Sequence, residues 1–292
     1  MQKLRRVVLD KMIAARLTSR QVDMMLYLSK YQDESGLIQG VYYRSVCEDT
    51  GMSIQSFYNV LKALEKMDLI QLEKNDSTDW DIMILDNDCR EYNKIGQYLN
   101  TNQAMLYSHG FCSLSGGAKL LALFLLRRCG ENQGGIRQKT EGFFDSLQSL
   151  MQVSKRVIKS HLKKLATFFS LGSQGEFYFV RPRKAGVEKS GKSEYQRYAE
   201  QIINMICRRN KVDKSSDQVT DTAGLMNQYR KSIQMDGKQP YDVLQKAVLT
   251  AVQVAGIGQK KPERYLQPKL VHKVLRGILG LDKPVQGTVT EN

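Results

Sequence analysis

Hydrophobic positions recur at helical spacing along two stretches of this chain, and both stretches follow the same plan. The first begins at Ser53 and the second at Ser154, and each serine is placed to cap the helix that follows. When the serines are aligned, the apolar positions coincide: Phe57 with Ile158, Leu61 with Leu162, and Leu64 with Leu165. The pattern predicts amphipathic helices at 53–69 and 154–168, with Met67 and Val157 also facing inward.

The segments around these two helices match as well. A short helical pattern precedes each one, at 43–50 and at 143–151, and Gly51 supplies a tight turn in the first copy because glycine accepts positive φ. Two short hydrophobic strands follow each helix. Their ranges are 69–73 and 80–85 around the polar tip 74–79, and 168–171 and 176–181 around 172–175. Helix, turn, helix and hairpin, found twice, predict two winged helix-turn-helix units.

Further elements are predicted before and between these units. Residues 1–17 form a basic amphipathic arm or helix that packs on the first domain, mediates dimerisation or lies along DNA. Thr18 and Gln21 fit a capping box, so a helix begins near Ser19, and 36–41 reads as a short strand. The run 115–129 is apolar almost all round, which predicts a helix buried between the two units or at a dimer interface.

The predicted fold class is mainly α with small β-hairpin wings, as two winged helix-turn-helix domains followed by an all-α C-terminal domain. Helices are expected in the last domain at 194–210, 223–234, 240–255 and 270–279. The predicted organisation begins with an N-terminal arm and first winged domain at 1–90, followed by a connector at 91–110 that contains one short helix near 92–99. A second winged domain at 111–183 and a basic linker at 184–193 come next. The helical domain at 194–281 and a disordered tail at 282–292 complete the chain.

Composition narrows the class of protein. Of the 292 residues, 41% are hydrophobic and 25% are charged, as in a folded globular chain. No apolar run approaches the roughly 18 residues of a membrane span, and the N-terminal stretch lacks the apolar core of a secretory signal. We therefore expect a cytoplasmic protein with no membrane partner.

Candidate chemistry is sparse. The five cysteines are scattered without metal-ligand spacing, and the three histidines are isolated. The chain has no GxxxxGK[ST], no GxGxxG after a strand and no HExxH. These features predict no catalytic residues, no metal and no cofactor, and hence a protein that is not an enzyme.

Charge points to a partner. The chain carries 44 lysines and arginines against 30 acidic residues, a formal net charge of +14. Nucleic acid is the commonest polyanionic partner of such a chain, and a solvated basic surface is the alternative.

The outward face of the first predicted helix suits base recognition. Gln55 and Asn59 carry paired donors and acceptors that match adenine edges, whereas hydroxyl and ammonium groups suit phosphates. A solvated helix face has the same composition, but this face follows the turn from which a helix-turn-helix enters the major groove.

The second predicted helix is strongly basic, and so is the segment 181–192, a candidate linker that could also track DNA. His161 on this helix is expected at the surface or at a phosphate rather than as a metal ligand. One hypothesis is a division of labour, with the first unit reading bases and the second adding backbone affinity. The candidate DNA-binding residues are Ser53, Gln55, Ser56, Tyr58, Asn59, Lys62, Lys74, Ser154, Lys155, Arg156, Lys159, Ser160, Lys163, Arg181, Arg183 and Lys184.

The element order over 18–182 and its internal repeat resemble the tandem winged-helix DNA-binding region of plasmid and phage replication initiators. The C-terminal helices, with the segment YLQPKLVHKVLRGIL, are similar to the DnaD-type helical domain of replisome organisers, although they lack its aromatic-rich final motif. The resemblance implies repeated binding sites at an origin, a homodimer joined through the N-terminal unit, and recruitment of a helicase or helicase loader by the C-terminal domain.

The sequence therefore favours a sequence-specific double-stranded DNA-binding protein that initiates or organises replication of a plasmid, phage or other mobile element. A transcriptional regulator with the same DNA-binding half is the alternative, its C-terminal helices serving dimerisation or effector sensing. A partition protein or a basic scaffold is a third reading.

Overall fold

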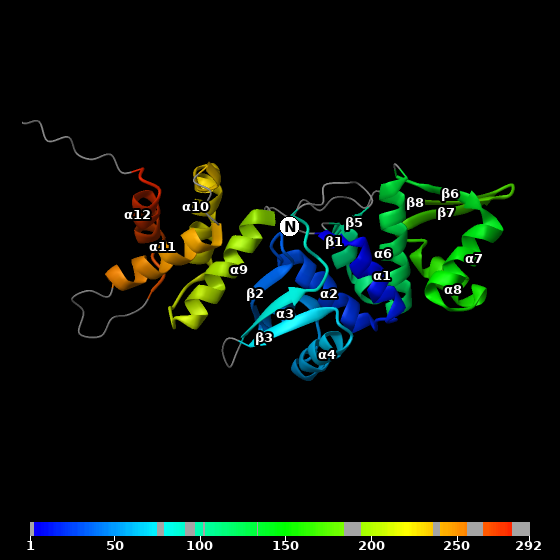
Figure 1. The fold of residues 1–292 in the computed structure, drawn as a ribbon, viewed down its shortest axis with the longest axis horizontal. Coiled ribbons are helices and arrows are strands. Elements are labelled where there is room, and N and C mark those ends of the chain that lie inside the picture. Colours follow the sequence, from blue (N-terminus) through cyan, green and yellow to red (C-terminus); the bar gives the residue numbers. More distant parts are fainter. Residues whose placement is uncertain are drawn as a thin grey trace, which may run out of the picture. The chain divides into compact units, whose positions relative to one another are not determined.

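The computed structural model describes residues 3–74, 79–90, 97–101, 103–132, 134–183, 194–235, 240–255 and 265–281. The chain divides into two compact units, Met1–Ser190 and Gly191–Asn292, each with its own hydrophobic core (Figure 1). Helices predominate and the strands form small antiparallel sheets. This confirms the prediction of a mainly helical fold with small sheets.

The first unit contains two halves with the same order of elements. The first half comprises α2 (Ser19–Tyr31), β2 (Leu37–Tyr42), α3 (Tyr43–Thr50), α4 (Ile54–Lys66), β3 (Ile70–Lys74) and β4 (Asp79–Ile84). Its three strands are antiparallel in the order β2-β4-β3. The helix α2 begins where the capping pattern predicts, because the Thr18 backbone N–H donates to Gln21 Oε1 at 2.8 Å.

The second half repeats this arrangement. It comprises α6 (Gly116–Glu131), β6 (Ile136–Lys139), α7 (Thr140–Met151), α8 (Lys155–Leu165), β7 (Phe169–Gln174) and β8 (Phe177–Pro182), with the strand order β6-β8-β7. The turn before α4 has Gly51 at φ 64°, and the turn before α8 has Gln152 at φ 50°. In both halves the chain reverses through a left-handed residue at the same place, so the repeat extends to the backbone of the turn.

The N-terminal segment is integrated into the first unit. It forms β1 (Lys3–Arg5) and α1 (Arg6–Ala14), and β1 pairs antiparallel with β5 (Tyr98–Asn100). Leu4, Val8 and Met12 are fully buried. Residues 3–14 therefore pack within the chain, but not on the predicted first domain alone: β1 contacts α2 of the first half, whereas α1 contacts α6 and α7 of the second.

The segment between the two halves differs from its prediction. It continues from β5 into η1 (Ala104–Tyr107) and α5 (His109–Cys112). The prediction of a helix near 92–99 is wrong for residues 98 and 99, because these residues form a strand that pairs with β1. Residues 91–96 lie outside the described part of the chain.

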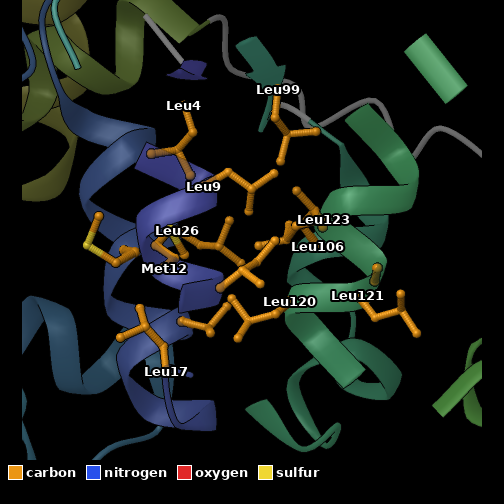
Figure 2. Packing of buried hydrophobic residues seen from close by; sticks show 14 of the residues in the cluster. Leu4, Leu9, Met12, Leu17, Leu26, Leu99, Leu106, Leu120, Leu121 and Leu123 are labelled. Atoms are coloured by element: carbon orange, nitrogen blue, oxygen red, sulfur yellow. The ribbon is translucent and has the colours of Figure 1, made fainter. Parts of the chain in front are cut away.

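The helix α6 joins the two halves. It packs against α1 and α2 on one side and against α8 on another, and the buried side chains of both halves form one cluster. Figure 2 shows Leu9 of α1 pointing toward Leu123 of α6. Of the two alternatives for 115–129, burial inside the chain is the one observed, with α6 packed between the two halves of the first unit.

Two positions predicted to face inward are exposed. Met67 is 39% exposed because α4 ends at Lys66, and the chain leaves helical geometry there. Val157 is 37% exposed, since it lies in the first turn of α8 beside the buried Ile158. In addition, Gly172 belongs to β7, whereas the sequence pattern placed it in the hairpin loop.

The second unit contains four helices in its described residues. They are α9 (Glu194–Arg209), α10 (Ser216–Met235), α11 (Pro240–Ala255) and α12 (Pro268–Ile278). The helix α10 begins earlier than predicted because Ser215 caps it: the Gln218 N–H donates to Ser215 Oγ at 3.2 Å, and the Ser215 N–H donates to Gln218 Oε1 at 2.8 Å. Within the described residues, no helix is both long enough and apolar enough to span a membrane.

The start of α6 gives a test of how the halves are joined. A Cβ atom on Gly116 would lie 2.2 Å from the Leu17 carbonyl oxygen, a backbone atom that cannot rotate away. Gly116→Ala should therefore lower the free energy of unfolding by about 1 to 3 kcal/mol, the usual cost of overpacking. Gly130→Ala, in the same helix with nothing within 4 Å of the added atom, should raise it by about 0.5 to 1 kcal/mol. Urea unfolding measures both, and equal effects would contradict this packing.

Candidate nucleic-acid interface

The outward face of α4 carries an amide pair. Gln55 and Asn59 are exposed one helical turn apart, and Gln55 Nε2 donates to Asn59 Oδ1 at 3.0 Å. The bond fixes the two amides relative to each other and uses only one donor and one acceptor. Because each amide offers both kinds of group, the pair retains donors and acceptors for the edge of a base. Lys62 is exposed one turn further along the helix.

Other predicted residues on α4 also support the helix itself. The Ser53 hydroxyl accepts from the Ser56 backbone N–H at 3.2 Å and lies 3.0 Å from the Ser56 hydroxyl. The half-buried Tyr58 ring lies 6.4 Å from the ring of Tyr43 on α3. These contacts anchor the first turn of α4 and connect its face to α3, so any role in binding is additional.

Ile54 is a candidate that the sequence pattern missed. It is the first residue of α4 and is 53% exposed. An apolar side chain at this end of a groove-binding helix can contact a thymine methyl group. The signal available in the sequence was an apolar residue ahead of the buried stripe that begins at Phe57.

The outward face of α8 is cationic, as predicted. The exposed members are Lys155, Arg156, Lys159, Ser160, Lys163 and Lys164. Lys155 Nζ lies 2.5 Å from Asp145 Oδ1 of α7, and Lys159 Nζ lies 5.5 Å from the centre of the Phe144 ring. An exposed ion pair contributes at most about 1 kcal/mol, so a phosphate can replace Asp145 at little cost. Ser154, the residue before α8, is exposed at its N-terminus.

His161 departs from its prediction. The imidazole is half-buried, and its Nε2 lies 2.9 Å from the position of a Cβ atom on Gly117 at the start of α6. Burial, with a smaller contribution from Lys164, lowers the pKa of His161 below its usual value. The neutral form of the ring is therefore favoured, and the ring packs against α6 rather than standing free on the cationic face of α8.

The remaining predicted residues lie on the hairpins. Lys74 ends β3, with Nζ 5.8 Å from the centre of the Trp80 ring. Arg181 is exposed on β8, and Arg183 Nε donates to the Phe169 carbonyl at 3.3 Å. Lys184 lies outside the described residues. The predicted residues thus form two groups, one around α4 and one around α8.

The buried thiols do not add a nucleophile to this surface. Desolvation raises the pKa of Cys129 and of Cys207 to about 11, so both are protonated at neutral pH. In the described ranges, no three histidine, cysteine or acidic side chains are grouped to hold a metal ion.

No protein-family model, no curated protein and no solved structure matches this chain. Function must therefore be argued from the arrangement of these side chains.

Base recognition by α4 is testable by mutation. Replacing Gln55 and Asn59 with alanine should reduce discrimination between a preferred duplex and random duplex by roughly tenfold or more, because a bidentate amide contact contributes about 1 to 3 kcal/mol of discrimination. Affinity for random duplex should change little. The matched control replaces Asn227 and Gln228, exposed amides of α10, with alanine. Equal losses on both duplexes in competition binding would exclude base recognition by α4.

Phosphate contact by α8 is tested by salt dependence. Replacing Arg156, Lys159 and Lys163 with alanine should weaken binding to every duplex and flatten the plot of log affinity against log salt by up to about 0.9 per lost contact. The control replaces Lys231, Lys269 and Lys273, which are exposed in the second unit, and removes the same charge. An unchanged slope in the α8 variant would show that these cations do not meet the backbone.

Proposed function

We propose that each half of the first unit is a winged helix-turn-helix domain, and that the protein binds double-stranded DNA in a sequence-specific manner. The observation that carries this proposal is the equivalent placement of two exposed helical faces. The amide face of α4 and the cationic face of α8 each follow a left-handed turn, at Gly51 and Gln152. A helix-turn-helix presents its second helix to the major groove from this position.

The two helices would contribute differently to binding. Amides such as Gln55 and Asn59 distinguish bases, whereas ammonium and guanidinium groups attract phosphates irrespective of sequence. In this proposal α4 selects the site, and α8 supplies most of the backbone affinity. Lys74, the last residue of β3, and Arg183, which follows β8, would meet the DNA backbone beside each groove.

The shared core would fix the distance between the DNA segments that α4 and α8 contact. Because α6 packs on α1, α2 and α8, the halves belong to one cluster of buried side chains. A single chain would then recognise a composite site whose parts have a constant separation, rather than two independent sites. A homodimer would recognise such a site twice.

We propose replication initiation or organisation on a plasmid, phage or other mobile element as the biological role. This rests on the resemblance of the tandem halves to replication initiators and on the separate helical unit at Gly191–Asn292. That unit would recruit a helicase or its loader. A transcriptional regulator with the same DNA-binding half would need no such partner.

Genome-wide immunoprecipitation from the host tests this role. We expect one dominant region of bound DNA with iterated sites, on a plasmid or prophage and close to the protein's own gene. The variant with Gln55 and Asn59 replaced by alanine should lose that enrichment. Peaks scattered over promoters would favour the regulator, and the absence of any enriched DNA would contradict sequence-specific binding itself.

A further inference from the structure

The sheet of the second half has one face outside the core. On β8, Tyr178 and Val180 face inward: the Tyr178 ring stacks on Phe143 of α7 with centroids 4.7 Å apart, and Val180 is fully buried. Side chains alternate along a strand, so Phe177, Phe179 and Arg181 lie on the opposite face. Figure 1 shows α7 and α8 together on one side of this sheet.

The register brings cations beside the two phenylalanines. Arg137 of β6 is directly opposite Phe179, and Lys139 is directly opposite Phe177. Opposite residues of an antiparallel pair share a face, so these four side chains stand together. The Arg137 guanidinium carbon lies 4.3 Å from the centre of the Phe177 ring and 5.8 Å from that of Phe179.

The other neighbour of Phe179 leaves space on this face. Gly172 of β7 is directly opposite Phe179, and a Cβ atom there would have nothing within 4 Å. The two phenylalanines are partly exposed, and Arg181 is exposed. Two aromatic rings therefore border an open patch, and three cations surround them.

We propose that this face binds a single strand of nucleic acid. Unpaired bases would stack on Phe177, Phe179 and the guanidinium plane of Arg137, and Lys139 and Arg181 would hold backbone phosphates. Stacked aromatics beside basic side chains are the usual means of binding unpaired bases, because every base has a π face. A duplex hides those faces, so this site would select single strands.

This inference goes beyond duplex binding and does not need α4 or α8. Arg181 is the one side chain also predicted to contact duplex DNA, so the test leaves it unchanged. Single strands of DNA and RNA offer the same bases and phosphates, and they are distinguished by using both as probes.

The experiment measures fluorescence anisotropy of labelled oligothymidylate and oligouridylate of about 12 nucleotides, long enough for one single-strand site. The full-length protein should bind at least one of them, and the probe that is bound more tightly shows whether the ligand is single-stranded DNA or RNA. Replacing Phe177 and Phe179 with leucine should weaken binding by about fivefold to a hundredfold per lost stack. Replacing both with tyrosine should preserve binding.

A second variant does not remove any aromatic side chain. Gly172→Ile places a branched side chain in the open space beside Phe179, and β-branched residues suit a strand. It should also weaken oligonucleotide binding, with an unchanged melting temperature and unchanged duplex binding. The variant with Gln55 and Asn59 replaced by alanine should bind the oligonucleotides as the unmodified protein does, which separates this site from the duplex interface.

Two results would overturn the proposal. One is the failure of the unmodified protein to bind either oligonucleotide. The other is unchanged oligonucleotide affinity in both the leucine and the isoleucine variants, which would show that the rings only stabilise the sheet.

Discussion

The close packing of α6 against the α1–α2 turn is the constraint on which the first unit depends. Gly116 at its start admits no side chain beside the Leu17 carbonyl, and Lys119 forms a buried ion pair with Asp23 of α2 at 2.5 Å. Burial raises the pKa of Asp23, although Lys119 opposes this effect. The pair is therefore costly to bury, and removing one partner alone would leave an uncompensated charge. Such a contact favours one arrangement of the two halves over others.

In the proposed function, that arrangement would give α4 and α8 a joint role. A helix-turn-helix on its own contacts a short site, whereas two such units on one core would contact two DNA segments at a set separation. The difference between the amide face of α4 and the cationic face of α8 suits one half to selection and the other to affinity. The outer face of the second sheet adds a surface of another kind, since it offers ring faces where the helices offer donors and cations.

The sequence pattern predicted the elements that are determined by local interactions, such as helix spacing and capping. The spacing of Phe57, Leu61 and Leu64 predicted α4, the same spacing predicted α8, and capping residues located α2. Long-range contacts were beyond such patterns: the pairing of β1 with β5 joins segments far apart, and the packing of His161 on Gly117 requires two helices to meet. The open aromatic face was missed because it depends on strand register, which sets Arg137 opposite Phe179.

Selection of duplexes from a random pool by the full-length protein tests the central claim most directly. The account predicts enrichment of one motif, and it predicts that the variant with Gln55 and Asn59 replaced by alanine enriches a weaker or shorter motif while still retaining DNA at low salt. Retention of DNA that depends on salt alone, with no motif enriched after repeated rounds, would contradict sequence-specific binding by the two halves.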